Sequence, residues 1–570
     1  MSERSGIGGA GRGFLAAAAA LALADASIVT LGLPSILVEL DSSVEGVALI
    51  LGVYTVVLAV ALPVAAEVAR RRGGARVATA GVALFALASL ACGLVDAMGP
   101  LLVLRGVQAL GGAGTLVGAF VLLDGGEPGP GRRLWFAASI FGAAIGPALG
   151  GALTEAFDWR AIFLAQVPLI APAAIVAGLE ARREAAIGDP EPAERSAAER
   201  PASTLRIRPA LALALLSAAL TAVIFLVVLL LVAGWSVEPL AAAAAVSVLP
   251  IAAVAASRVG GNSETRAAAG CVLVAGGIAG LALIPGDSAW WTVPPQILAG
   301  AGMGLALPAL AGGLLPELSG RDVARVLAIR HLGIAAALAL LAPIVSSDLD
   351  ETIFTAREEG TAAVLDAPLP PEAKLDLAPQ LFAGVDTDDP RGQLERSVTE
   401  AREDLDGDER AELDTLAGQL DDVITGAVRD SFRIAFIVTA AFALAAALVM
   451  LWGALAPGAW IARRAVAAAA VASIAGAGVY AVLFAGSERE RVAIADPCTV
   501  DRELPGTGGI GGALQDVSLE ALDRAACELG SSREELLLAL FDDDARDRFE
   551  DRHGEDPRSL TTIGPALLGL

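Results

Sequence analysis

Apolar stretches of about 20 residues recur along the whole sequence, and this recurrence limits the possible folds more than any other feature. A helix needs about 20 mainly apolar residues to cross the hydrocarbon core of a bilayer. Roughly thirteen stretches meet that requirement: 14–37, 46–66, 77–96, 99–122, 134–154, 161–179, 209–233, 237–256, 268–285, 292–315, 323–345, 432–455 and 465–485. One such stretch would also suit a buried helix of a soluble protein. So many in succession predict a polytopic membrane protein.

The acidic charge of the chain is confined to two segments that are too polar to cross a bilayer. The net charge is −24. Residues 348–430 contain 23 acidic and 7 basic side chains, and residues 487–570 contain 19 and 9, so the remainder is close to neutral. Acidic appendages repel nucleic acid and anionic lipid, which argues against both as partners of these segments.

The distribution of basic residues predicts how the chain is oriented. With the N-terminus in the cytoplasm, 20 of the 24 Lys and Arg residues outside the acidic segments fall on cytoplasmic segments, as the positive-inside rule requires. We therefore expect a multi-pass plasma-membrane protein whose C-terminus and acidic segments are extracytoplasmic. Residues 1–27 imitate a secretory signal, but the apolar run continues to Leu37 and favours a retained span.

The spans group as six, a polar linker, six and one more. The stretch PVAAEVARRRGG at 63–74 has the same proline and glycine spacing as PIAAVAASRVGG at 250–261, an echo typical of transporters built from two halves. The expected fold is all-α, with two six-helix halves, an extra C-terminal helix and two extracytoplasmic acidic helical segments. The expected domains are 1–180 (first half), 181–208 (cytoplasmic linker), 209–347 (helices 7–11), 348–431 (acidic loop), 432–455 (helix 12), 465–485 (helix 13) and 486–570 (acidic tail).

The four cysteines divide between spans and tail. Cys92 and Cys271 lie in expected spans and suit packing as small apolar residues. Cys498 and Cys527 lie in the tail, which the orientation places in a space where disulfides form, so they are a disulfide candidate. Two separate thiols are the alternative, because spacing does not prove a bond.

Ionisable side chains inside spans cost about 2.5–3.5 kcal/mol each on insertion scales, so each one needs a physical reason. Asp25 lies midway along the first span, Arg105 lies in the fourth, and Arg330 and His331 lie in the eleventh. A carboxylate that changes its protonation near a permanent positive charge is what proton-coupled export requires. A static pair, in which Asp25 and Arg105 only neutralise each other, is the alternative.

Four motifs follow one another over roughly residues 20–170. They are DASIVTLGLPSI from Asp25, LLVLRGVQALGGA with Arg105 and Gln108, GPALGGAL with Gly146, Pro147, Gly150 and Gly151, and WRAIFLAQVP from Trp159. In this order they resemble the motifs of the drug:proton antiporters of the major facilitator superfamily that usually have fourteen helices. Arg330-His331-Leu-Gly is similar to an Arg-Gln-x-Gly stretch in the second half of the same branch.

The resemblance implies a major facilitator fold, a small-molecule substrate and protons as coupling ions. It implies that Arg105 takes part in proton transfer, and that Asp25, Gln108, Arg330 and His331 bind protons or substrate. It also implies gating by GPALGGAL in the fifth span, where small residues let helices approach closely and proline can bend the helix. Ordinary helix packing is the alternative role for these glycines.

The stretch that follows the second span departs from the family pattern. Where the family has an aspartate that latches the cytoplasmic side, this chain reads AEVARRRGG, with Glu67, Arg70, Arg71 and Gly73. Glu67 lies one turn earlier on the same helix face and is the expected substitute. Without it, the latch would be weaker.

No nucleotide-binding loop, metal-spaced cluster or nucleophile triad occurs in the sequence, so we expect no enzyme, cofactor or metal site, and an ion gradient as the energy source. The leading hypothesis is a proton-coupled exporter of small hydrophobic or amphipathic compounds, acting in the lipid bilayer by alternating access. Two alternatives remain open: an exporter of cell-envelope lipid or glycolipid, and a non-transporting sensor or scaffold. An extracytoplasmic protein partner would bind 348–431 or 486–570.

Overall fold

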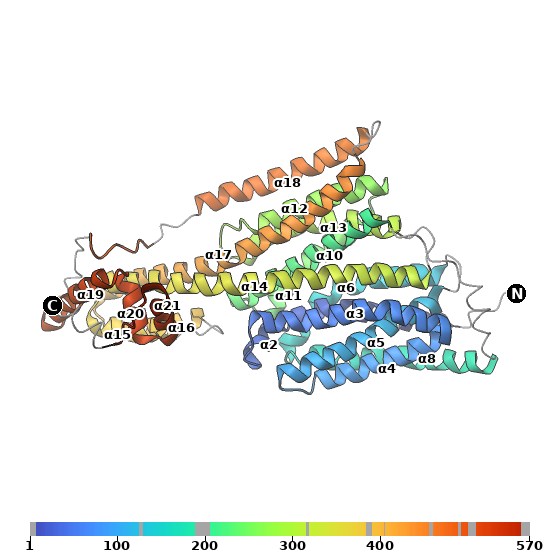
Figure 1. Cartoon of the computed structure of the whole chain (residues 1–570), viewed down its shortest axis with the longest axis horizontal. Coiled ribbons are helices and arrows are strands. Elements are labelled where there is room, and N and C mark those ends of the chain that lie inside the picture. Colours follow the sequence, from blue (N-terminus) through green and yellow to red (C-terminus); the bar gives the residue numbers. More distant parts are fainter. Residues whose placement is uncertain are drawn as a thin grey trace. The chain divides into compact units, whose positions relative to one another are not determined.

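The computed structural model describes residues 7–124, 129–187, 206–314, 319–382, 390–403, 405–454, 460–487, 492–499 and 509–559. Within these ranges the chain forms helices joined by turns and loops, with no strand, which confirms the expected all-α class. The chain divides into two compact units (Figure 1). The membrane unit consists of residues up to 232, 237–346 and 432–487, and the acidic unit consists chiefly of 347–431 and 488–570. Most of the expected linker, 188–205, lies outside the described residues.

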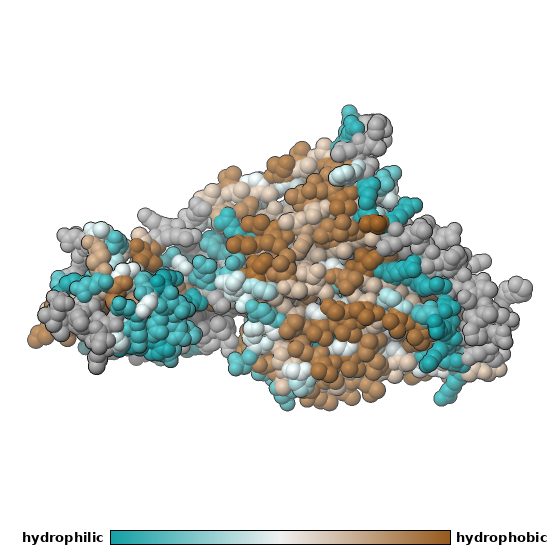
Figure 2. All heavy atoms as spheres, in the orientation of Figure 1, coloured by the Kyte–Doolittle hydropathy of each residue, from teal (hydrophilic) through white to brown (hydrophobic). Residues whose placement is uncertain are grey.

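Twelve helices in the described part of the chain are long and apolar enough to cross a bilayer. They are α1 (Gly9–Thr30), α3 (Val44–Arg72), α4 (Gly74–Cys92), α5 (Met98–Asp124), α7 with α8 (Ala161–Leu164 and Gln166–Ile187), α10 (Ile207–Val228) with a π-helical turn, α11 (Pro239–Ala256), α12 (Ser263–Leu281), α13 (Val293–Leu314), α14 (Gly320–Asp366), α17 (Gly407–Ala454) and α18 (Trp460–Gly486). The remaining expected span coincides with α6 (Pro130–Ala156), part of whose side chains lie outside the described residues. Figure 2 shows hydrophobic residues gathered over the middle of this unit, with hydrophilic ones toward its ends.

The first span is shorter than the sequence indicates. The apolar run predicts one helix over 14–37, but α1 ends at Thr30 and α2 (Leu33–Glu39) begins after a turn. A Cβ at Gly32 in this turn would lie 2.9 Å from the terminal methyl group of Ile162, so a larger residue there would displace the Ile162 side chain. Pro34 lies in the first turn of α2, where its missing amide hydrogen costs nothing. The turn, and not the end of the apolar run, ends the first span.

Glycine allows the same helix pairs to approach closely in both halves. α4 packs along α5, and α12 packs along α13 (Figure 1). A Cβ at Gly114 of α5 would lie 2.8 Å from the Cα of Gly81, and one at Gly302 of α13 would lie 2.7 Å from the backbone nitrogen of Val274. Membrane helices associate through such close packing because lipid gives no hydrophobic drive between them.

Two helices are much longer than a bilayer requires. α14 has 47 residues and α17 has 48, or about 70 Å each at about 1.5 Å per residue, whereas one span needs about 20 residues. Each helix therefore continues from the membrane unit into the acidic unit. The prolines of APLPPEAKLDLAP at 367–379 predict an irregular start to the acidic loop, and the structure bears this out only for 367–370. Most of that stretch belongs to α15 (Pro371–Phe382).

The extra helix α18 is fastened to the second half of the membrane unit. It packs along α12. The Ser473 hydroxyl donates a hydrogen bond to the carbonyl of Val272 at 3.0 Å, and the Tyr480 hydroxyl donates to the carbonyl of Trp291 at 2.6 Å. These polar contacts fix the rotation of α18 about its own axis, so it packs with the bundle in a defined register.

The acidic unit has an apolar core of its own. α16 (Pro390–Glu403) and the first part of α17 pack with α15, and α19 (Gly509–Leu529), α20 (Arg533–Phe541) and α21 (Asp543–His553) pack with one another. The first group buries Leu377, Leu394, Leu413, Leu416 and Leu420. The second buries Leu522, Leu536 and Phe549. This acidic segment therefore folds as a packed domain, in which Arg533, Glu534 and Glu535 are the buried charges among the described residues.

Contacts between residues far apart in sequence join the loop and the tail into this one unit. The buried Arg533 of the tail lies 2.7 Å from the carboxylate of Asp366, and Arg357 lies 2.9 Å from that of Asp542. Phe354 packs against Leu538. Cys498 and Cys527 form a disulfide within the tail. The sequence treats the loop and the tail as separate segments, whereas the structure packs them together.

Glu358 gives the acidic unit a defined dependence on pH. Its side chain is half-buried beyond the apolar part of α14. Burial, and then the nearby Glu535 carboxylate, raises the pKa of Glu358 from 4.5 to about 7. Because the folded pKa exceeds the unfolded one, the proton on Glu358 stabilises the unit fully below pH 4.5, and this contribution is lost as the pH rises through about 7.

We expect Glu358→Gln to flatten the pH dependence of the acidic unit's stability between about pH 5 and pH 8, because the titration is removed. The measurement is hydrogen–deuterium exchange of the α20 and α21 amides in the full chain, corrected for intrinsic rates. Glu372→Gln, at an exposed position on α15, is the control and keeps the wild-type dependence. Identical pH dependence in wild type and Glu358→Gln would contradict the role of Glu358.

Candidate functional site

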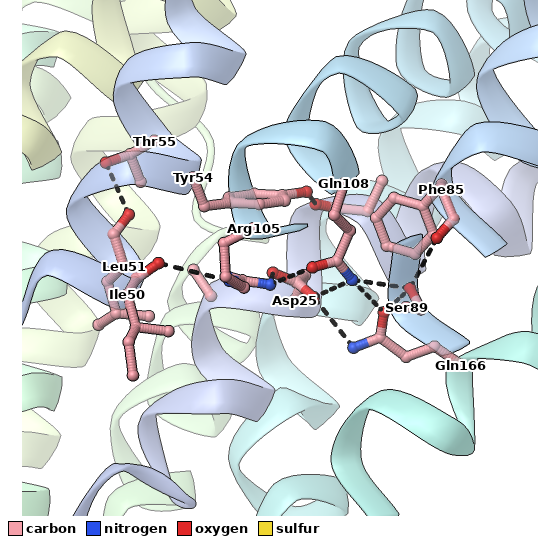
Figure 3. A network of polar contacts seen from close by, with 12 residues as sticks. Asp25, Ile50, Leu51, Tyr54, Thr55, Phe85, Ser89, Arg105, Gln108 and Gln166 are labelled. Carbon is pink, nitrogen blue, oxygen red and sulfur yellow. Dashed lines mark hydrogen bonds and ion pairs between the residues drawn. The ribbon is translucent and has the colours of Figure 1, made fainter. Parts of the chain in front are cut away.

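Polar side chains from four helices of the membrane unit meet at one buried point (Figure 3). They are Asp25 of α1, Ser89 of α4, Arg105 and Gln108 of α5, and Gln166 of α8, and each is at most 1% exposed. All five precede the linker, so the first half of the chain supplies the described members of this cluster.

An ion pair lies at the centre of the cluster. Arg105 Nη1 is 2.7 Å from Asp25 Oδ2. The guanidinium carbon of Arg105 lies 4.4 Å from the ring centroid of Tyr54 and 5.5 Å from that of Phe163. Ring faces attract cations, and more strongly when water is excluded, so the two rings stabilise the buried charge. Arg105 therefore interacts with a carboxylate and with two aromatic rings at once.

Two side-chain amides complete the surroundings of the carboxylate. Gln166 Nε2 donates to Asp25 Oδ1 at 2.9 Å, and Gln108 Nε2 lies 3.2 Å from the same oxygen. Gln108 Oε1 accepts a hydrogen bond from Arg105 Nη1. Gln108 Nε2 also lies 2.7 Å from Ser89 Oγ. Two side-chain amides from two other helices thus donate to Asp25 Oδ1, while Arg105 forms an ion pair with Oδ2.

The sequence motifs point to Asp25, Arg105 and Gln108, and the structure brings these three together. Sequence reasoning misses Ser89 and Gln166, which complete the cluster (Figure 3). Gln166 lies inside the WRAIFLAQVP motif, where a polar amide in an apolar run is a signal that could have identified it. Ser89 has no such signal, because serine is common in membrane helices and often bonds its own helix, as Ser89 does to the carbonyl of Phe85 at 2.8 Å.

Arg330 and His331 lie on α14 and do not join this cluster. His331 Nδ1 lies 2.7 Å from the carbonyl of Leu327 on its own helix, and Arg330 is half-buried. Within the described residues, no hydrogen bond or ion pair connects either of them to Asp25 or Arg105. A Cβ at Gly333, two residues later, would collide with the backbone of Ala214 in α10. The glycine of this motif therefore permits close packing of α14 on α10.

The glycines of α6 face two different helices. A Cβ at Gly146 would lie 2.7 Å from the Cβ of Ser27 in α1, and one at Gly150 would collide with the carbonyl of Ile28. Gly151 instead faces Ala243 of α11. Pro147 is buried within the helix. α6 therefore packs between α1 of the first half and α11 of the second.

The family model for the Major Facilitator Superfamily matches residues 15–343, more than half of the chain and all of the buried cluster. The chain belongs to the major facilitator superfamily. This major facilitator protein is a multi-pass membrane protein of a transporter family, which is not an enzyme class. The match ends near the start of the acidic unit, so that unit lies outside the shared family region.

Curated relatives match part of this major facilitator chain. It is 33% identical over 150 residues to the multidrug resistance protein Stp of Mycobacterium tuberculosis, covering 25% of this chain and 28% of Stp. It is 35% identical over 160 residues to the tetracenomycin C resistance and export protein of Streptomyces glaucescens, covering 27% of this chain and 29% of that protein. The chain thus spans less than a third of the length of these relatives.

A solved structure shares the fold. The bacterial homologue of the human lysosomal transporter Spinster, in an inward-facing and unoccupied conformation, matches with a TM-score of 0.51 and 14% sequence identity. The match covers 79% of this chain and 98% of that one. At this identity the likeness concerns the fold alone.

The altered latch stretch of this major facilitator protein lies at the end of α3, where the chain continues into α4. The Glu67 carboxylate lies 2.5 Å from Arg70 Nη2 and 2.6 Å from Arg71 Nε. Gly73 joins α3 to α4 with φ of 95°, a conformation that a side chain disfavours. Glu67 is therefore paired with arginines of its own helix.

We expect Gly150→Ala to destabilise the membrane unit by about 1–3 kcal/mol, because the added methyl group collides with the carbonyl of Ile28. Gly52→Ala in α3 is the matched control, since nothing lies within 4 Å of a Cβ built there. The measurement is thermal unfolding of the detergent-solubilised chain, followed by a thiol-reactive dye that reaches the buried Cys92 and Cys271. Equal unfolding midpoints for the two variants would show that α1 and α6 can separate at no cost.

Proposed function

We propose that this protein is a proton-coupled exporter of small hydrophobic or amphipathic compounds that works by alternating access. The observation that most supports the proposal is the Asp25–Arg105 ion pair, fully buried in a bundle of membrane helices. Ionisable groups at such depth cost free energy and mark ion or proton pathways in membrane proteins.

Proton exchange at Asp25 gives the cluster two states of different charge. When Asp25 takes up a proton, the ion pair with Arg105 is lost, while the guanidinium stays charged. Gln108 Oε1 and the ring of Tyr54 remain as partners for Arg105. When the proton leaves, the pair forms again. A conformational equilibrium can be driven by this step because the two states differ in their contacts with α1.

The packing of α6 provides a route from this cluster to the second half. α1 carries Asp25 and packs on Gly146 and Gly150 of α6, and Gly151 of the same helix packs on α11. A shift of α1 that follows protonation would therefore act on the interface between the two halves. Small residues let these helices slide at close range without bulky side chains to repack.

Two further considerations support export of apolar compounds. The curated relatives that match part of the chain have names that state multidrug resistance and export. The helices of the membrane unit are themselves strongly apolar, which suits contact with hydrophobic cargo. The positive-inside pattern further supports a cytoplasmic N-terminus, with the acidic unit on the extracytoplasmic side, where its disulfide would persist.

We expect Asp25→Asn to abolish pH-gradient-driven transport while the protein still inserts, because the amide cannot exchange the proton. The measurement uses proteoliposomes with an imposed pH gradient, ethidium as a lipophilic cation and a fluorescent phospholipid as cargo. Asp158→Asn, at an exposed loop position, is the control and keeps transport. Gradient-driven transport that survives in Asp25→Asn would remove Asp25 from the mechanism.

The same assay separates the competing functions. Movement of the phospholipid but not of ethidium would favour an exporter of envelope lipid. Movement of neither cargo by correctly inserted wild-type protein would favour a sensor or scaffold, and the acidic unit would then be the segment to test for a protein partner.

We expect a membrane-impermeant maleimide to label Ser559→Cys in intact cells and not Ser196→Cys in the linker. The first residue ends the described tail and the second belongs to the predicted cytoplasmic linker. Labelling of Ser196→Cys only after the membrane is permeabilised is the internal control. The reverse pattern would invert the proposed orientation.

A further inference from the structure

Gln166 belongs to the buried cluster, although the sequence motifs assign it no role. It is the first residue of α8, directly after the one-residue break at Ala165 that separates α7 from α8. Its side chain is 1% exposed. Its Nε2 lies 2.9 Å from Asp25 Oδ1, closer than the 3.2 Å of Gln108 Nε2. Of the two amides, Gln166 is thus the nearer donor to the carboxylate.

In the wild-type structure Gln108 makes the longer contact with Asp25, because its amide is shared among more acceptors than it has hydrogens. An amide nitrogen has two hydrogens. Gln108 Nε2 has three acceptors in reach, Ser89 Oγ at 2.7 Å, Gln166 Oε1 at 3.1 Å and Asp25 Oδ1 at 3.2 Å. The Asp25 oxygen is the most distant of the three. In the described part of the chain, the hydrogen bond donated by Gln166 Nε2 goes to Asp25.

Contacts of its own amide oxygen and contacts of the chain just before α7 fix the position of Gln166. Its Oε1 accepts from Gln108 and lies 3.3 Å from Ser89 Oγ, so the amide is oriented with its nitrogen toward Asp25. Trp159 Nε1, just before α7, donates to Glu39 at 2.6 Å, and Arg160 pairs with Glu39 and Asp96 at 2.5 Å each. A donor that is held in this orientation favours the ionised form of the Asp25 carboxylate.

We infer that Gln166 is a positioning residue that sets the pH at which Asp25 takes up its proton. Hydrogen bonds donated to a carboxylate favour its charged form. Protonation of Oδ1 leaves the Gln166 N–H without that acceptor, so Gln166 opposes protonation and promotes release. The inference rests on the proposed function, in which Asp25 exchanges a proton.

The other ionisable groups near Asp25 make no hydrogen bond or ion pair with Gln166 in the described part of the chain. The ionisable and charged side chains that face Asp25 are Arg105 of α5, Tyr54 of α3 and Cys92 of α4. The described ionisable residues of α6, α8 and α10, which also pack on α1, lie toward the ends of those helices, and α7 has none. A shift caused by Gln166→Met is therefore attributable to the lost amide donor.

The test is the pH titration of Asp25 itself, read by infrared difference spectroscopy on the full reconstituted chain. The carbonyl band of the protonated acid is assigned to Asp25 by its absence in Asp25→Asn. Gln166→Met, similar in length and without an amide, is expected to move the midpoint up by about one pH unit, which is about a tenfold gain in proton affinity. Gln166→Asn keeps a shorter amide and is expected to give a midpoint between those of wild type and Gln166→Met.

Gln296→Met is the matched control. Gln296 of α13 is also a buried glutamine, and its amide donates to Thr292 at 2.9 Å in the second half of the chain. In Gln296→Met, the midpoint of the Asp25 titration is expected to equal that of wild type. The inference is overturned if Gln166→Met or Gln166→Asn leaves the midpoint unchanged or lowers it, if Gln296→Met shifts it equally, or if no Asp25 band appears between about pH 4 and pH 9.

The outcome is separable from that of the transport assay. If Asp25 titrates with a midpoint that depends on Gln166 while Asp25→Asn still transports, the inference holds and the proton-coupled function fails. If transport requires Asp25 but Gln166→Met leaves the titration unchanged, the function holds and the inference fails.

Discussion

The buried ion pair between Asp25 and Arg105 imposes the strongest physical constraint on the membrane unit. Each charge costs about 2.5–3.5 kcal/mol at the centre of a bilayer helix, and removing one partner of a buried pair costs about 3–5 kcal/mol. The chain compensates with Gln108 of α5, the helix that carries Arg105, with Gln166 of α8 and with the ring of Tyr54 in α3. The pair thereby fixes α3, α5 and α8 around α1. A change in charge at Asp25 alters the contacts of all of these helices together.

The glycines of α6 connect this constraint to the second half of the chain. Gly146 and Gly150 allow α1 to approach on one side, and Gly151 allows α11 to approach on another. Dispersion forces and small residues hold such helices together in lipid, and these forces resist sliding less than interlocked large side chains do. The glycine motif of α6 therefore contacts both the helix that carries Asp25 and a helix of the second half. Alternating access would use this arrangement to convert proton exchange into movement.

The acidic unit is a domain built from two distant parts of the chain. α14 and α17 extend well past the length of a span, and the tail returns to pack on their extensions through Arg533 and Phe354. Its apolar core accounts for how such an acidic chain can fold, because charges on the surface of a domain remain solvated while leucines are buried. The proton on Glu358 ties the stability of this domain to the external pH under the proposed orientation.

The all-α class, the approximate positions of the apolar helices and the presence of costly charges at Asp25 and Arg105 can be predicted from the sequence alone, because hydrophobicity and charge act locally along the chain. The resemblance of the motif around Arg105 to the family pattern also indicated Gln108. The packed fold was needed to reveal that Ser89 and Gln166 join Asp25, that Arg330 and His331 stay apart, and that the first span breaks at Gly32. It also decided that the acidic loop and tail form one unit. Which polar groups meet depends on how helices rotate and approach, and close contacts between residues distant in sequence set that geometry, which no local pattern of residues specifies.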